Sequence, residues 1–144
     1  MAHVEDVGAY ILERLGRITA MKLQKLIYYC QAWSLVWEEA PLFDDEIQAW
    51  ANGPVSPKLY KRHRGGFEVV SVGGDASALT ASERAVVDDV LKFYGDKSSQ
   101  WLSELTHKEE PWKRARENAG LKPGQRGSEV ITHEAMANYY SSLL

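Results

Sequence analysis

The sequence predicts a mainly α-helical fold, a compact multi-helix single domain around one central apolar helix with a short two-stranded β accessory. Apolar residues recur at helical spacing in several segments, which is typical of amphipathic helices. Residues 19–39 are apolar on most sides, as expected of a helix packed by several neighbours. A length of 144 residues fits one domain, residues 1–144, with a core large enough to need no metal or disulfide.

Composition and charge exclude several classes of protein. A net charge of −3 argues against a general nucleic-acid binder. The single cysteine, Cys30, cannot form an internal disulfide and suits a reducing compartment. No signal peptide and no apolar run of membrane-spanning length is evident in the sequence. We therefore expect a cytoplasmic protein without membrane contact.

The first two helices follow from apolar spacing and from their end signals. Residues 4–15 place their apolar side chains on one face, and Gly16 is expected to end this helix. Thr19 is the expected N-cap of the central helix, which should run to about Glu39, shortly before Pro41. Trp33, on the apolar side of this helix, is expected to have a structural role in the core.

Two strands are expected in the middle of the chain. Residues 46–50 alternate polar and apolar side chains, as in a half-buried strand, and end at Trp50, an expected structural anchor. Asn52, Gly53 and Pro54 should then turn the chain. Residues 67–72 form the second predicted strand, between two pairs of glycines.

The remaining helices are predicted mainly from their capping signals. Ser56 followed by Pro57 is an N-cap with proline at the first helical position, so a short helix should follow. Thr80 and Glu83 form a capping box before a helix that should end at Gly95. Helices are expected over residues 58–64, 98–105, 111–117 and 132–143, with a loop over 118–128.

No motif for metal or cofactor binding is present, so we predict no metal, no cofactor and no enzymatic activity. The four histidines form no HExxH pair, and a lone cysteine cannot form a CxxC site. The best case for catalysis is His107 beside Glu109 and Glu110, where a histidine and a carboxylate could act in acid–base chemistry. The structural alternative is that the acids stabilise a helix start while His107 binds a loop carbonyl.

The short helix after Pro57 carries the most conspicuous charge cluster. Lys58, Lys61 and Arg64 give it a basic face, and Tyr60 adds an aromatic side chain. Such a face could contact phosphates or an acidic protein surface, although clusters of this kind are commonly only solvated. Because the whole chain is acidic, an acidic protein partner is favoured over DNA.

Four blocks, in this order, resemble the Panacea domain of the SocA-like, phage-associated antitoxin family. The joint occurrence of the second and third is the specific signal. The blocks are KLQKLIYYCQAW (22–33), PLFDDEIQAWANGPVSPKLYKRHRG (41–65), LTHKEEPWKRAR (105–116) and ITHEAMANYY (131–140), and the specific signal lies in AWANGPVSPKLY and LTHKEEPW.

The resemblance implies an antitoxin of a bacterial or prophage toxin–antitoxin pair, which neutralises a toxin encoded nearby by direct binding. SocA-type members also act as adaptors that deliver the toxin to the ClpXP protease. The family fold is mainly helical, and the family has no catalytic motif to carry over. Our hypothesis for the toxin-binding surface comprises Lys58, Tyr60, Lys61, Arg64, His107 and Trp112.

Two other functional classes remain as alternatives. One is a phage-associated regulator that binds nucleic acid through the basic helix, which would require an affinity that falls steeply with salt. The other is a small hydrolase built on His107 with Glu109 or Glu110. These three functions require different arrangements of these side chains in space, so the structure can be compared with each.

Overall fold

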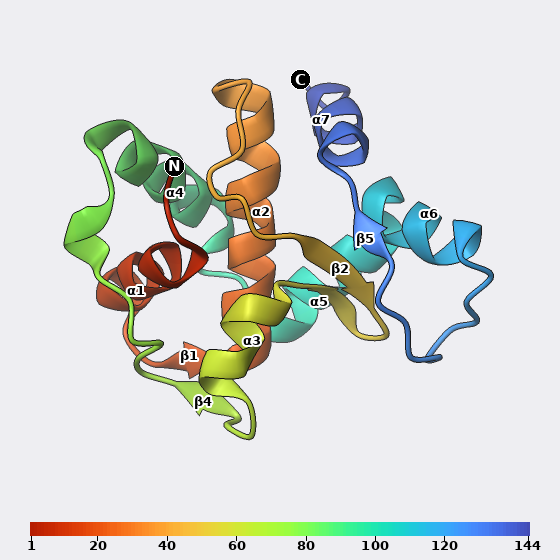
Figure 1. Ribbon diagram of the computed structural model, residues 1–144, viewed down its shortest axis with the longest axis horizontal. Coiled ribbons are helices and arrows are strands. Elements are labelled where there is room, and N and C mark those ends of the chain that lie inside the picture. Colours follow the sequence, from red (N-terminus) through yellow and green to blue (C-terminus); the bar gives the residue numbers. More distant parts are fainter.

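The computed structural model describes all 144 residues, and its centre is helix α2, Ala20–Trp37 (Figure 1). Twelve successive residues, from Leu23 to Ser34, are buried on every side of this helix. The helices that contact α2 are α1 (Val4–Leu15), α3 (Pro57–His63), α4 (Ala81–Tyr94), α5 (Ser99–Lys108) and α7 (His133–Ser141). The prediction of a mainly α fold around a central apolar helix is therefore confirmed.

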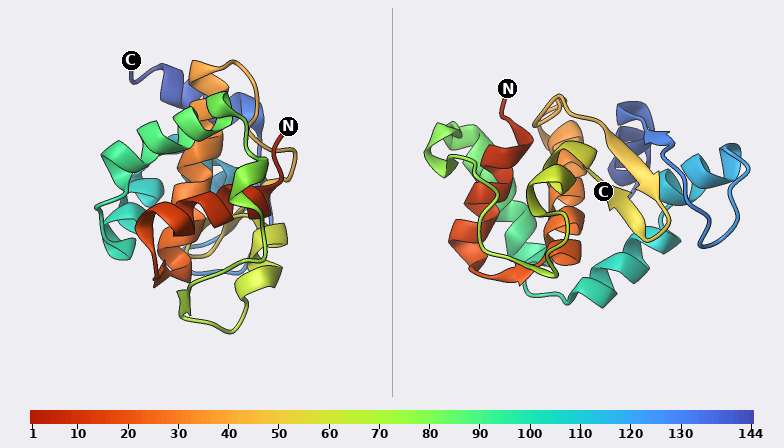
Figure 2. Two further views of the ribbon diagram at one scale, coloured as in Figure 1. Left: turned by 90° about the vertical axis from the view of Figure 1, so that its left-hand side faces the viewer. Right: turned by 60° about the horizontal axis from the view of Figure 1, so that its bottom comes forward.

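The surrounding elements form two groups on opposite sides of α2. Helices α1 and α4 lie on one side, with the 3₁₀ turn Ala76–Ala78 between them in sequence and α1 packed against it (Figure 2). The other side holds helix α6 (Glu110–Asn118), helix α7 and the sheet that contains strand β2 (Ile47–Trp50). No helix combines the length and the apolar character needed to cross a membrane.

The helix ends follow the predicted capping chemistry closely. The Thr19 hydroxyl accepts a hydrogen bond from the Lys22 amide, 3.0 Å away, at the start of α2. Both halves of the capping box are present at the start of α4, where Thr80 and Glu83 bond each other's backbone amides. Helix α2 stops at Trp37, slightly earlier than predicted, because the chain turns through a left-handed residue two positions later.

Trp33 lies at the border of the core, where α2 meets α4 and α7. Its side chain is 9% exposed, and its indole nitrogen donates to the Tyr94 hydroxyl at 3.0 Å. The ring also packs on Tyr140 and stacks on Trp37, which is 41% exposed. Trp33 therefore differs from a purely apolar core residue, because its indole nitrogen joins α2 to α4. One face of its ring is covered by the exposed Trp37.

The β structure differs from the expected pair of strands, because it consists of two small antiparallel sheets. The larger sheet has the strand order β3–β2–β5, and the smaller pairs β1 with β4. The strands are β1 (Ile18–Thr19), β2 (Ile47–Trp50), β3 (Gly53–Val55), β4 (Glu68–Val69) and β5 (Val130–Ile131).

The strand predicted over residues 67–72 is therefore shorter than expected and has a different partner. Only Glu68 and Val69 pair, and they pair with β1. Val69 and Val72 are buried while Val70 is exposed, a spacing of three that an alternating strand does not produce. The chain leaves the ladder because the second buried valine packs elsewhere in the core.

The turn expected at Asn52, Gly53 and Pro54 lies one step earlier, at Ala51 and Asn52. Gly53 and Pro54 belong instead to strand β3, where Pro54 faces Ala49 of β2. Strand β3 is at the edge of its sheet, a place where proline, which lacks an amide hydrogen, is tolerated. Gly53 has φ +128°, a value that side-chain-bearing residues rarely adopt.

Candidate binding site

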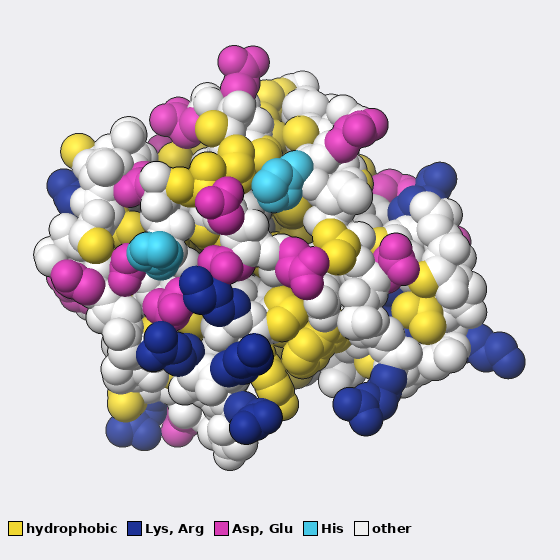
Figure 3. Space-filling view, viewed as in Figure 1, with side chains coloured by type: hydrophobic (Ala, Val, Ile, Leu, Met, Phe, Trp, Pro, Cys, Tyr) yellow, Lys and Arg dark blue, Asp and Glu magenta, His cyan; other side chains and the backbone are white.

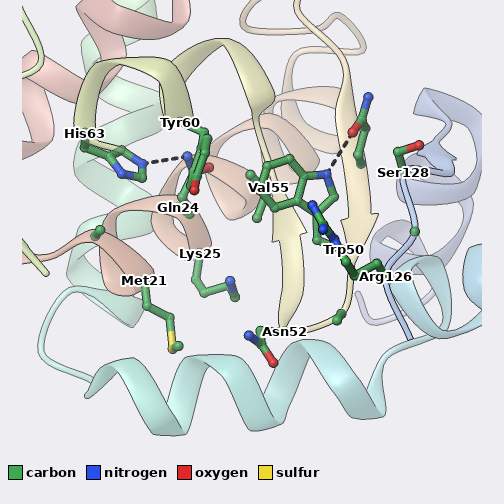
Figure 4. A pocket seen from close by; sticks show the side chains of 14 residues that line it. Met21, Gln24, Lys25, Trp50, Asn52, Val55, Tyr60, His63, Arg126 and Ser128 are labelled. Carbon is green, nitrogen blue, oxygen red and sulfur yellow. Dashed lines mark hydrogen bonds between the residues drawn. The ribbon is translucent and has the colours of Figure 1, made fainter. Parts of the chain in front are cut away.

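A pocket of about 610 Å³ lies between the first turns of α2, the β2–β3 hairpin, α3 and the loop at residues 126–128 (Figure 4). Each of these elements places side chains in it. Trp50 and Tyr60 are its aromatic residues, and charged and amide groups reach it from α2, the hairpin and the loop. The other lining residues are Ala20, Met21, Gln24, Lys25, Gln48, Ala51, Asn52, Val55, His63, Arg126, Gly127 and Ser128.

Lys25 is the unusual group in this pocket, because it is a buried cation without a buried anion. Its side chain is only 2% exposed, and its ammonium has one long hydrogen bond, 3.4 Å to the Pro54 carbonyl. No carboxylate lies within ion-pair distance of its Nζ among the salt bridges of the chain. Burial lowers the pKa of Lys25 to about 8.

Gly53 allows the hairpin backbone to approach the end of the Lys25 side chain. A Cβ at Gly53 would lie 2.5 Å from Lys25 Cε and 2.9 Å from its Nζ, so the end of the lysine would have to move away. The positive φ of this residue favours glycine as well. The absence of a side chain at Gly53 leaves room for the end of Lys25 beside the hairpin, where its ammonium bonds the Pro54 carbonyl.

Gln24 ties α3 to α2 along the wall of the pocket. Its Oε1 accepts from the Ser56 amide at 2.8 Å, and its Nε2 donates to the Ser56 carbonyl at 3.3 Å. The same Nε2 lies 2.9 Å from His63 Nε2 (Figure 4). Since an amide nitrogen donates, this ring nitrogen must accept, which keeps His63 neutral. Burial also lowers the pKa of His63.

The aromatic part of the pocket is fixed by the β2–β3 hairpin. The rings of Trp50 and Tyr60 meet edge to face with centroids 5.0 Å apart. The indole nitrogen of Trp50 donates to Gln48 Oε1 at 2.8 Å, and its carbonyl accepts from the Trp112 indole at 2.8 Å. Trp50 thereby connects α3 to α6 through the hairpin.

The residues expected to be structural divide between the core and this pocket. Trp50 and the β2–β3 hairpin form part of the pocket wall. The sequence alone did not indicate this role for them. Trp33 is not among the lining residues and contacts Tyr94 and Tyr140 instead. Of the two tryptophans, Trp50 is thus in a position to contact a ligand and Trp33 is not.

The hypothetical toxin-binding residues fall into two groups, one on α3 and one at the junction of α5 and α6. His107 and Trp112 stack with ring centroids 4.1 Å apart, and both side chains are half-buried. Burial lowers the pKa of His107, opposed by a hydrogen bond to the Asn52 backbone. In the α3 group, Tyr60 contacts the side chain of Trp50.

The basic cluster divides into paired and unpaired cations. Lys58 lies 3.5 Å from carboxylate oxygens of both Glu5 and Asp45. Arg62, a second cation of α3, also pairs with Glu5. Lys61 and Arg64 are exposed and have no such partner, and Figure 3 shows Lys and Arg side chains gathered over α3. These two are the free cations of the predicted set.

The hydrolase hypothesis requires His107 to act together with Glu109 or Glu110, and neither carboxylate bonds His107, since Glu110 pairs with Arg114 at 2.9 Å. Glu109 is buried, and its Oε1 accepts hydrogen bonds from the Tyr29 and Tyr140 hydroxyls at 2.7 and 2.8 Å. His107 stacks on Trp112 and has no hydrogen bond to Glu109. Desolvation raises the pKa of Glu109, against the lowering effect of the two hydroxyls.

Two features of this surface are not evident from apolar spacing and charge clusters. Lys25 falls within the apolar central helix, and a lysine flanked by Leu23 and Leu26 in a helix buried on all sides is the signal that could have found it. Phe67 falls at the start of the predicted strand, yet its side chain is 80% exposed, and its carbonyl accepts from the Ala20 amide at the pocket edge. This exposed phenylalanine lies three residues after Arg64 in the chain.

The fold is a small, mainly helical domain with a pocket beside its central helix. A family model described as antitoxin SocA-like, Panacea domain, matches residues 23–113, which is more than half of the chain. The chain therefore belongs to the SocA-like antitoxin family, as the four sequence blocks predict. Matched residues include Lys25, the hairpin, α3 and the His107–Trp112 pair. No curated protein and no solved structure matches this chain.

Proposed function

We propose that this protein is a cytoplasmic, non-enzymatic antitoxin that neutralises a protein toxin encoded nearby by binding it directly. The observation that carries the proposal is the match of the SocA-like Panacea family over residues 23–113. The separation of His107 from the buried Glu109 supports a binding role over hydrolysis. The same membership supports a bacterial or prophage origin of the toxin–antitoxin pair.

The surface we propose for the toxin is centred on the exposed end of α3. Lys61 and Arg64 have no internal carboxylate partner, so their charges are available to a partner protein. Phe67 adds an aromatic side chain that is 80% exposed, and aromatic and arginine side chains dominate the energetics of interfaces. Lys58 contributes less because Glu5 and Asp45 already neutralise it.

Tyr60, His107 and Trp112 belong to the proposed surface as its less exposed members. Tyr60 continues from the free cations toward the aromatic wall at Trp50. His107 and Trp112 lie beyond the hairpin, where a large partner could reach them while contacting α3. The charge of the free cations favours an acidic surface on the toxin.

Growth rescue tests this proposal directly. The adjacent open reading frame is expressed from an inducible promoter, alone and with this protein, and the two chains are tested for copurification. The double variant Lys61→Glu/Arg64→Glu should lose rescue while its melting temperature stays unchanged, because both side chains are exposed. Lys92→Glu/Lys122→Glu is the matched control, since these exposed lysines lie on α4 and in the loop after α6, away from the proposed surface.

Three results decide between the possibilities. Rescue by the wild type and by the control, but not by the α3 variant, supports both the antitoxin role and this surface. Full rescue by the α3 variant places the toxin interface elsewhere. A neighbouring product that is not toxic, or toxicity without rescue or complex formation, contradicts the antitoxin role.

We also propose, from the same family membership, that the protein can deliver its toxin to the ClpXP protease. In that case the toxin should decay quickly only when this protein and the protease are both present. The measurement is the half-life of the toxin after translation is stopped, in cells with and without ClpX. An unchanged half-life with full rescue would leave neutralisation by binding alone.

A further inference from the structure

We infer that the Lys25 pocket is a binding site for an apolar residue that carries a free carboxylate, the chemistry of a polypeptide C-terminus. In this arrangement the ammonium of Lys25 pairs with the carboxylate, and the aromatic wall of Trp50 and Tyr60 packs on the apolar group. The inference rests on the pocket alone and holds whether or not the protein is an antitoxin.

The first argument is the uncompensated charge of Lys25. An ammonium group has three donors, but Lys25 has a single long hydrogen bond, 3.4 Å to the Pro54 carbonyl, and no anion beside it. Burying a cation without a partner is strongly unfavourable, so buried charges are normally paired. A ligand that supplies the anion completes this site.

The second argument is the number of charges available in the pocket. His63 accepts from Gln24 and is neutral, so it adds no positive charge at the wall. Arg126 lies at the exposed edge of the pocket, whereas Lys25 is buried. One buried ammonium matches one carboxylate, while a phosphate dianion would leave an unpaired negative charge inside the pocket.

The third argument is the shape and lining of the pocket. Trp50, Tyr60, Val55 and Met21 provide apolar surface beside the ammonium, and about 610 Å³ is within the size range of small-ligand sites. Figure 4 shows Lys25 extending toward Asn52, whose side-chain amide can donate to the second carboxylate oxygen. The pocket thus places a positive charge directly beside apolar surface.

The fourth argument is that the hairpin holds Lys25 in this position before any ligand arrives. Gly53 leaves room for the end of the side chain, because a Cβ there would lie 2.5 Å from Lys25 Cε. A charged group fixed in advance loses little conformational entropy on binding. The pocket therefore has the preorganisation expected of a binding site.

The experiment titrates the full-length protein with N-acetyl-leucine and N-acetyl-phenylalanine, following tryptophan fluorescence and heat release. Their C-terminal amides are the matched ligands without charge. We expect the acids to bind at least about tenfold (about 1.4 kcal/mol) more tightly than the amides, because an amide fills the pocket and leaves the buried ammonium without a counter-charge. Lys25→Met should abolish this preference, and Lys22→Met, outside the pocket lining, should retain it.

Additional ligands distinguish the source of the carboxylate. A pentapeptide ending in the preferred residue that binds more tightly than the acetylated amino acid indicates a protein C-terminus. Phenylpropionate binding as tightly as that peptide indicates a free acid instead. Three results overturn the inference: no wild-type binding of either acid at millimolar concentration, unchanged binding by Lys25→Met, or tighter binding of phenyl phosphate than of the carboxylates.

Discussion

Replacing Lys25 by methionine should make the protein more stable at neutral pH. Burial lowers the pKa of Lys25 from 10.5 to about 8, so the folded state holds its proton less tightly than the unfolded chain. At about 1.36 kcal/mol per pKa unit, this difference corresponds to about 3 kcal/mol of stability. Methionine has a similar length and no charge, so this penalty is absent from the variant.

The sign of the pH dependence follows from proton binding. Between pH 8 and 10.5 the unfolded chain binds more protons at this lysine than the folded chain does, so the free energy of unfolding of the wild type rises with pH. The full penalty is present below pH 8 and is relieved as pH approaches 10.5. The advantage of Lys25→Met should therefore shrink over this window.

Urea denaturation of both proteins between about pH 6 and pH 10 measures this difference. Lys22→Met is the control, because Lys22 is only half-buried on the same helix and should change stability far less. Equal or lower stability of Lys25→Met at neutral pH would refute the reasoning. That result would mean that contacts within the chain already compensate the ammonium.

Two further substitutions test the packing around the site. Gly53→Ala should destabilise the fold by about 1–3 kcal/mol in urea denaturation, because φ is +128° and the new Cβ would meet Lys25. In the double variant with Lys25→Ala, only the part of this loss of stability that is due to the clash should be recovered. Glu109→Ala should cost about 1–3 kcal/mol, since the buried hydroxyls of Tyr29 and Tyr140 lose their acceptor, whereas Glu109→Gln keeps an acceptor oxygen and should retain most of the stability.

The helices could be predicted from sequence because their signals are local. Thr80 and Glu83 are three residues apart and bond each other's amides, so the capping box needs no tertiary information. The same holds for Ser56 with Pro57 at the start of α3. The apolar residues of α2 also mark it as the central helix, since a helix without a polar face must be covered all round.

The strand predicted over residues 46–50 from its alternation is confirmed as β2, but the pairing of the strands could not be predicted, because it depends on contacts between distant residues. Strand β1 has two residues and exists only because Glu68 and Val69 come to lie beside it. Gly53 and Pro54 are locally typical of a turn, yet the edge of a sheet accepts a proline and this particular backbone geometry. Short strands of this kind contain too few residues for an alternating pattern to appear.

The pocket could not be predicted for a related reason, because nothing local says where the end of Lys25 lies. A lysine side chain on a helix ordinarily extends to solvent, but the hairpin at Gly53 lies against the end of this one. The basic face of α3 is visible in the sequence, but the pairing of Lys58 with Glu5 and Asp45 is not. The fold thus decides which of the visible charges are free.

The proposed binding role of Lys25 accounts for a buried ammonium that has a single long hydrogen bond and opposes stability. A methionine at this position would fill similar space in α2 without the penalty of burying a charge. Proteins retain such unfavourable groups mainly where binding or catalysis requires them. The pocket also adjoins the basic surface, since the Ala20 amide at its edge bonds the Phe67 carbonyl. A partner seated on Lys61, Arg64 and Phe67 would therefore lie beside the edge of the pocket.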